Sequence, residues 1–95
     1  MSERVRLFNS PAHPAKDGRA WCIQIAEVEH YYKSKEAMKA LADLRLQISR
    51  KRPGQDARMQ LLTPGGYVEL HSGDVDDVAQ ALEGLVNMAL ILPMD

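Results

Sequence analysis

The chain has 95 residues, of which 45% are hydrophobic and 26% are charged, and its one cysteine, Cys22, excludes an internal disulfide. This composition is ordinary for a globular protein, and a chain of this length can bury one modest core. We therefore expect a single domain spanning residues 1–95. The N-terminal residues lack the apolar run of a secretory signal, and no apolar stretch approaches the roughly 18 residues that cross a membrane. We therefore expect a cytoplasmic protein that does not enter a membrane.

The formal net charge of −1 conceals an uneven distribution along the chain. Residues 1–60 hold all 12 Lys and Arg with 7 of the 13 acidic residues, which gives +5. Residues 61–95 hold the other 6 acidic residues and no Lys or Arg, which gives −6. Such asymmetry indicates either two halves that attract each other within one fold or a basic surface for an anionic partner.

The first part of the chain predicts two strands, residues 3–8 and 19–28, separated by a proline-containing loop. In both strands apolar side chains alternate with other residues: Val5 and Leu7 in the first, and Trp21, Ile23 and Ile25 in the second. The alternation loses its phase near Glu27, so we expect a bulge or the end of the strand there.

A helix is predicted over residues 35–51, with Ser34 as its N-cap and Pro53-Gly54 after its end. Its expected core line consists of Ala37, Leu41, Leu44 and Ile48. Leu46 falls on the polar face of this helix and is therefore an exposed leucine unless a partner covers it.

The second part of the chain predicts a hairpin with strands 57–62 and 67–71 around Thr63-Pro64-Gly65-Gly66. Proline followed by glycine favours a type II turn, which needs a positive φ at its third residue. A second helix over residues 74–92 follows, capped by Asp74, with Asp76 and Asp77 in its first turn. Its apolar stripe comprises Val75, Val78, Ala79, Leu82, Leu85, Val86, Ala89 and Leu92.

The element order β-β-α-β-β-α predicts an α+β fold. We expect a four-stranded antiparallel sheet with both helices packed on one face. One such topology is a permuted ferredoxin-like arrangement, with strand 19–28 central, strand 3–8 beside it, and strand 67–71 between 19–28 and 57–62. The alternative is two consecutive β-hairpin-α units, each pairing mainly within itself or with a second chain.

No pattern in the sequence favours catalysis, a cofactor or a metal ion. Glycine-rich phosphate-binding and dinucleotide-binding motifs are absent, and His13, Cys22, His30 and His71 lack the spacing of a zinc site. Cys22 with His71 is the one nucleophilic pairing that adjacent strands could bring together. We therefore expect a non-catalytic protein with no catalytic residue, no cofactor and no metal site.

Protein binding is the better-supported class of function. The last predicted helix becomes apolar all round at its C-terminal end, and an all-round apolar helix is normally buried. We expect Leu46, Met88, Leu90 and Ile91 to contact a protein partner. A second copy of the chain is the favoured partner, because symmetric dimers are the commonest soluble assemblies.

Nucleic-acid binding is the alternative function. Arginines and aromatic groups on an open sheet have the chemistry with which RNA-recognition sheets stack single-stranded bases. The candidate residues are Arg4, Arg6 and Tyr67 with the basic cluster Arg50, Lys51 and Arg52. The net charge of −1 and the acidic Glu69 among these strands count against this alternative.

Overall fold

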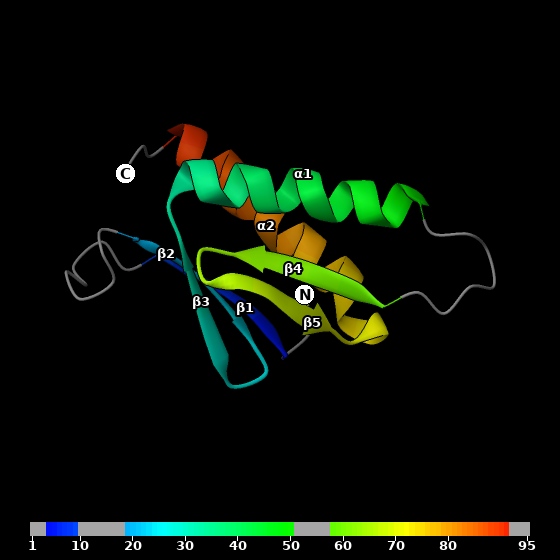
Figure 1. Ribbon diagram of the computed structural model, residues 1–95. Helices are drawn as coiled ribbons and strands as arrows, with labels where there is room; N and C mark the ends of the chain where they lie inside the picture. The colour runs from blue at the N-terminus through cyan, green and yellow to red at the C-terminus, as the bar shows by residue number, and fades with distance from the viewer. Residues whose placement is uncertain (1–3, 10–18, 51–57, 92–95) are drawn as a thin grey trace.

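The computed structural model describes residues 4–9, 19–50 and 58–91, and they form an α+β fold (Figure 1). The elements in chain order are β1 (Val5–Asn9), β2 (Trp21–Ile25), β3 (Val28–Tyr32), α1 (Ser34–Arg50), β4 (Met59–Thr63), β5 (Gly66–Leu70), a short 3-10 helix η2 (Ser72–Asp74) and α2 (Val75–Ile91). Strands β1, β2 and β3 make one antiparallel sheet, and β4 and β5 make a second one.

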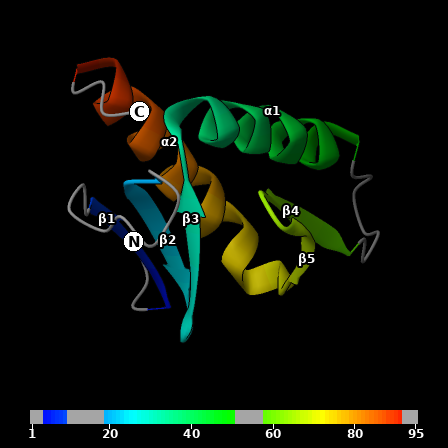
Figure 2. The same ribbon diagram turned by 60° about the vertical axis from the view of Figure 1, so that its left-hand side comes forward.

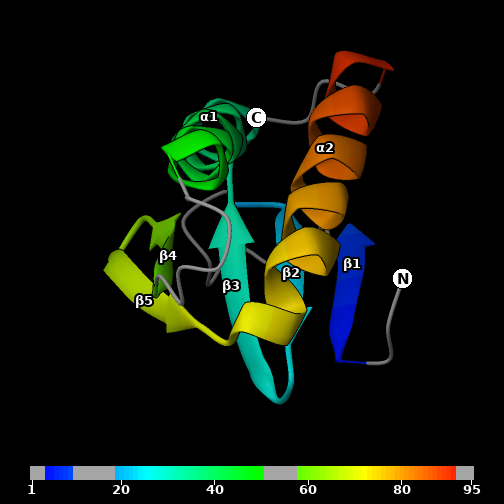
Figure 3. The same ribbon diagram turned by 90° about the vertical axis from the view of Figure 1, so that its right-hand side faces the viewer.

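Strand β2 is the centre of the three-stranded sheet, and α2 crosses one face of that sheet (Figures 2 and 3). The pairing of β1 with β2 agrees with the predicted neighbours. Cross-strand partners in an antiparallel sheet point to the same face. The face that includes Leu7 and Ile23 therefore forms the core, and Trp21, Ile23 and Tyr32 on it are completely buried or nearly so.

The predicted strand 19–28 is in fact two strands joined by a turn at Ala26 and Glu27. Ala26 has a positive φ of 55°, which is uncommon for a residue with a side chain. The predicted end of the strand near Glu27 is confirmed. The sequence lacks the Asn-Gly or Asp-Gly pair that usually announces such a tight hairpin, so β3 was not predicted.

Helix α1 confirms the predicted helix and its core line, with Ala37, Leu41 and Leu44 buried and Ile48 partly buried. The helix begins one residue before the predicted position, because the Ala37 N–H donates to the carbonyl oxygen of Lys33 at 2.9 Å. The Glu36 carboxylate in turn accepts from the Lys33 N–H at 2.8 Å, as the acidic residue of a capping box does.

The β4–β5 hairpin is also confirmed, although residue 57 lies outside the described residues. Its turn differs from the predicted type II turn, because the positive φ (125°) is at Gly66 and not at Gly65. The Thr63 hydroxyl donates to the Gly66 carbonyl at 2.6 Å and closes the turn.

The predicted single four-stranded sheet is not confirmed, and neither is its ferredoxin-like strand order. Strand β5 pairs with β4 and does not lie between β2 and β4. The backbone of Gln60 on β4 is bonded to the side chain of Gln47 from α1, and the Leu62 carbonyl accepts from the Tyr32 hydroxyl. Because side chains occupy this edge of β4, another strand cannot pair there. The alternative of two units that each pair mainly within themselves is closer to the structure.

Helix α2 completes the core between the two sheets and α1. Its buried residues are Val75, Val78, Ala81, Leu82, Leu85 and Ala89. All but Ala81 belong to the predicted stripe, and Leu92 of that stripe lies outside the described residues. The two helices were expected on one face of one sheet, but α2 covers the three-stranded sheet whereas α1 packs on β4 and against α2 (Figure 3).

Candidate protein interface on the helix pair

The last turn of α2 carries the most exposed large apolar side chains among the described residues. Leu90 is 70% exposed and Ile91 is 78% exposed, whereas Ala89 between them and the rest of the helix is 6% exposed. Met88, one residue earlier, is also exposed. The helix therefore buries one stripe up to Ala89 and presents apolar groups on its other sides, as the sequence predicts.

Helices α1 and α2 pack against each other and cross at a steep angle, since α1 is seen nearly end-on in Figure 3 while α2 runs up the picture; we call the line where they meet the seam (Figures 1 and 3). Arg45 of α1 and Glu83 of α2 form an ion pair across it, with 3.3 Å between Nη2 and Oε2. Met38 lies about two helical turns before Arg45, and Leu90 lies about two turns after Glu83. Both of these side chains are exposed, Met38 by 41% and Leu90 by 70%.

Leu46 lies on the side of α1 opposite the core and is 48% exposed. Lys35, Lys39 and Arg50 share this stripe of α1 at helical spacing, and all three are exposed. The exposed leucine that the sequence predicts thus shares its stripe of α1 with three cations, and Asp43 lies one turn before it.

The outward stripe of α2 carries the opposite charge. Asp76, Gln80, Glu83, Asn87 and Leu90 follow one another on it at helical spacing, and all are exposed. Asp76 lies in the first helical turn and Arg50 in the last turn of α1, where each charge complements the helix dipole. The charge asymmetry of the sequence therefore appears on the surface as a basic α1 stripe beside an acidic α2 stripe.

Part of this charge asymmetry is used within the fold. Arg4 donates to the buried carboxylate of Asp74 through two hydrogen bonds of 3.1 Å, and Arg58 lies 3.6 Å from Glu69. Within the described parts of the chain, Lys35, Lys39, Arg50 and Asp76 have no such partner. The stripes therefore keep charge that the fold does not neutralise.

The residues predicted to bind nucleic acid are not brought together. Arg4 is bound to Asp74, and Arg6 is exposed on β1 of the three-stranded sheet. Tyr67 lies on β5 of the other sheet, where its hydroxyl donates to Asp43 at 3.2 Å. Arg50 ends α1, and residues 51 and 52 lie outside the described residues. The prediction placed these strands in one sheet, whereas the structure places Arg6 and Tyr67 on different sheets.

The three-stranded sheet has a second face that neither described helix covers (Figure 2). Alternation places Arg6 and Phe8, then Cys22 and Gln24, then Glu29 and Tyr31 on it. Phe8 is 43% exposed, and the register aligns it with Cys22 and Tyr31. Sequence reasoning missed Tyr31, because its strand was not recognised.

Cys22 is buried within this face, and its environment suppresses thiolate formation. Burial, followed by the nearby charge of Glu29, raises the pKa of the thiol from 9.0 to about 11. The Cys22 Sγ lies 3.8 Å from Glu29 Oε2, so its polar neighbour is a carboxylate and not the imidazole of His71. A protonated, buried thiol is a poor nucleophile.

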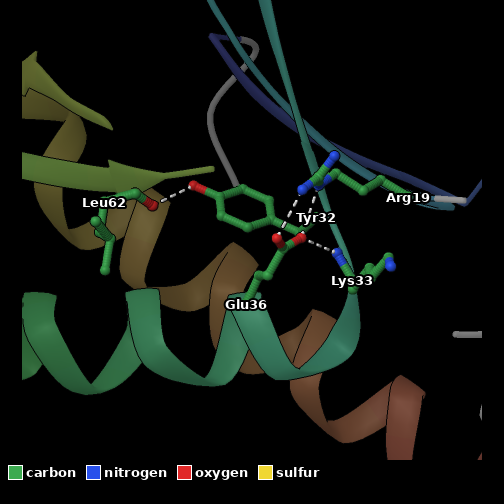
Figure 4. A network of polar contacts seen from close by, with 5 residues as sticks. All are labelled: Arg19, Tyr32, Lys33, Glu36 and Leu62. Atoms are coloured by element: carbon green, nitrogen blue, oxygen red, sulfur yellow. Dashed lines mark hydrogen bonds and ion pairs between the residues drawn. The ribbon is translucent and has the colours of Figure 1, made fainter. Parts of the chain in front are cut away.

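A polar network joins the two sheets at the start of α1 (Figure 4). Arg19 donates to both oxygens of Glu36, from Nε at 2.8 Å and from Nη2 at 2.9 Å. These bonds are the main reason that the pKa of Glu36 lies below its ordinary value. The Tyr32 hydroxyl donates to the Leu62 carbonyl at 2.8 Å, and burial raises the pKa of this tyrosine strongly.

This network borders a cleft of about 250 Å³ lined by Tyr32, Glu36, Lys39, Leu62, Thr63 and Pro64. The Tyr32 and Thr63 hydroxyls and the Glu36 carboxylate are all engaged in hydrogen bonds of the fold. A second hollow of about 350 Å³ is lined by Arg4, His71, Gly73, Asp74 and Asp77, and the Arg4–Asp74 pair crosses it. In each hollow one lining carboxylate is held in an ion pair of the fold, Glu36 with Arg19 and Asp74 with Arg4.

Two further observations concern the described residues alone. They contain no group of three His, Cys, Asp or Glu side chains placed to hold a metal ion. None of their helices has the length and apolar character needed to cross a membrane. Comparison of the chain with protein-family models, curated proteins and solved structures finds no match.

Proposed function

We propose that this protein is a small, non-catalytic interaction or regulatory module that acts as a homodimer through the C-terminal end of α2. The observation that carries the proposal is the exposure of Leu90 (70%) and Ile91 (78%) on a helix whose core-facing stripe is buried up to Ala89. We assign Met88 and Leu46, which are also exposed (41% and 48%), to the same contact.

The physical argument is the hydrophobic effect. Burying a leucine or isoleucine side chain completely in an interface contributes about 1.5–3 kcal/mol to the free energy of association. Clustered exposed apolar groups with a polar surround mark interaction sites more often than scattered ones do. A second copy places two such helix ends in one interface by symmetry, since a two-fold axis uses the same patch twice.

The polar groups of the fold support a non-catalytic role. The Arg19–Glu36 and Arg4–Asp74 pairs join distant segments of the chain, and Cys22 is held as a thiol. One cysteine and no disulfide also suit a reducing compartment, so we place the protein in the cytoplasm.

The test is the mass of the protein in solution, measured by sedimentation equilibrium across a concentration series. We expect the native chain to dimerise, and the variant Leu90→Asp with Ile91→Asp to remain folded but monomeric. Val28→Asp is the matched control, because Val28 is also exposed (57%) but lies at the β2–β3 turn. A native chain that is monomeric at high micromolar concentration would refute the homodimer.

A second candidate function is binding of single-stranded nucleic acid on the uncovered face of the three-stranded sheet. The observation that favours it is the placement of Arg6, Phe8 and Tyr31 on that face. Bases can stack on aromatic side chains while arginine contacts phosphate. The expected signature is affinity for an oligonucleotide that falls steeply with salt and is lost in Phe8→Ala. Absence of binding at low salt would eliminate this candidate.

A further inference from the structure

We infer that the second copy docks across the helix pair with α1 of one protomer against α2 of its partner. This inference rests on the proposed homodimer and specifies its surface and its pairing. The surface consists of the basic α1 stripe (Lys35, Lys39, Leu46 and Arg50) and the acidic α2 stripe (Asp76, Gln80, Glu83, Asn87 and Leu90).

Charge decides between the possible pairings. If α1 packed on α1 of the partner, the cations Lys35, Lys39 and Arg50 would meet the cations of the other copy, and like charges in an interface are costly. If α2 packed on α2, the acidic stripes of the two copies would meet, with Glu83 already paired to Arg45 of its own protomer. When α1 packs on the partner's α2, both halves of the symmetric interface join opposite charges. The cations of α1 have no partner within the described fold and are free to make these contacts.

The apolar residues fit the same arrangement. Leu46 lies within the basic stripe, and Leu90 lies at the end of the acidic stripe. Each protomer would therefore contribute exposed apolar side chains from both helices, with charged groups around them. An apolar centre with a polar rim is the usual composition of a protein interface.

The size of the helix pair sets an expectation for affinity. Helices of this length are about 25 Å long and pack about 8–10 Å apart, so together they present a face of roughly 500 Å². A standard interface buries about 800 Å² on each partner. We therefore expect a reversible dimer whose pairing depends on charge and weakens as salt concentration rises.

Two charge-reversed variants test the pairing. The first reverses α1 through Lys35→Glu, Lys39→Glu and Arg50→Glu, and the second makes α2 basic through Asp76→Lys, Gln80→Lys and Glu83→Lys. Alone, each variant places like charges against like, so its self-association should be weaker than that of the native chain by about tenfold or more. Mixed in equal amounts, they present opposite charges in both halves of the interface and should form a heterodimer.

Native mass spectrometry and sedimentation equilibrium distinguish the outcomes. A native homodimer, weakened variants and a restored heterodimer support the inference. A native homodimer with variants that self-associate as the native chain does, and without preference for each other, overturns the pairing but leaves the homodimer standing. A monomeric native chain removes the proposed homodimer itself. Circular dichroism checks the fold of each variant. If a triple variant unfolds, the single variants Lys39→Glu and Asp76→Lys, each on its own chain, take the place of the two triple variants.

Discussion

The side-chain amide of Gln47 binds both backbone groups of Gln60. Its Nε2 donates to the Gln60 carbonyl at 2.8 Å, and its Oε1 accepts from the Gln60 N–H at 2.9 Å. One residue of α1 thereby occupies the edge of β4 in the way that a neighbouring strand would. An open strand edge invites pairing with other chains, and covering it prevents this.

Replacing Gln47 by alanine should lower the free energy of unfolding by about 1 kcal/mol, because two hydrogen bonds at a solvent-accessible strand edge are lost. Urea unfolding followed by circular dichroism measures the change. Gln60→Ala is the matched control, because both bonds involve the backbone of Gln60 and not its side chain. The free energy of unfolding of this variant should stay near that of the native chain. Equal stability of Gln47→Ala and the native chain would contradict this role.

Arg4→Ala should cost about 1–3 kcal/mol of stability, because it leaves the Asp74 carboxylate buried without its cation. Arg6→Ala removes the same residue type from the same strand at an exposed position, so its effect should lie within about 0.5 kcal/mol. The two variants are compared by chemical unfolding at neutral pH. Similar losses for both would show that the Asp74 contact contributes little.

The Arg19–Glu36 pair predicts a specific acid dependence of stability. Hydrogen bonding to Arg19 lowers the pKa of Glu36 below its ordinary value of 4.5. The folded state therefore binds this proton less readily than the unfolded state, and the stabilisation is present above pH 4.5 and lost as the pH falls through the folded pKa. Glu36→Gln should be less stable than the native chain at neutral pH and lose less stability on acidification.

The control for this pair is a double-mutant cycle of Arg19→Gln and Glu36→Gln, measured at neutral pH and again in acid. The coupling between the two changes should be present at neutral pH and shrink in acid. A coupling that does not change with pH would be inconsistent with an interaction of the ionised carboxylate.

Cys22 should resist alkylation in the native protein. A pKa of about 11 instead of 9.0 lowers the thiolate fraction at pH 8 by about a hundredfold, and burial limits access further. Iodoacetamide labelling, quantified by mass, should be slow in buffer and rapid in denaturant. Glu29→Gln should speed native labelling, because the carboxylate charge opposes thiolate formation. Native labelling as fast as that of a free thiol would disprove the assignment.

Replacing Gly84 and Gly66 by alanine should change the stability of the protein in opposite directions. At Gly84 in α2 an added Cβ would lie 3.7 Å from Leu7 Cδ2, an ordinary contact, so Gly84→Ala should stabilise the helix by about 0.5–1 kcal/mol. Gly66 has a φ of 125°, which a residue with a Cβ rarely adopts, so Gly66→Ala should destabilise the hairpin by about 1 kcal/mol or more. Thermal unfolding of both variants and of the native chain shows whether each substitution raises or lowers the melting temperature.

Both helices and the β4–β5 hairpin could be predicted from the sequence, because their signals are local. The spacing of Ala37, Leu41 and Leu44 defines the buried side of α1, and Pro64-Gly65 marks the hairpin turn. The same helical phase predicted that Leu46 and Leu90 would be exposed, and the structure confirms their exposure. Whether a partner covers them stays a prediction.

The separation of the two sheets could not be predicted, because long-range side-chain contacts decide it. Gln47 and Tyr32 have no sequence pattern that announces a bond to the edge of β4. The turn at Ala26 carries none of the residues that favour a positive φ, so β3 was merged with β2. For the same reason Arg6 and Tyr67, which the nucleic-acid hypothesis placed on one sheet, lie on different sheets.

The Arg4–Asp74 pair spans 70 residues of sequence. Contacts of such separation form late, because the intervening chain must be ordered or closed as a loop first. During synthesis from the N-terminus, Arg4 therefore has no access to its acceptor until residue 74 has been made. A chain that ends before residue 74 would hold β1 by its pairing with β2 alone, and β1 is joined to the start of α2 only after that point.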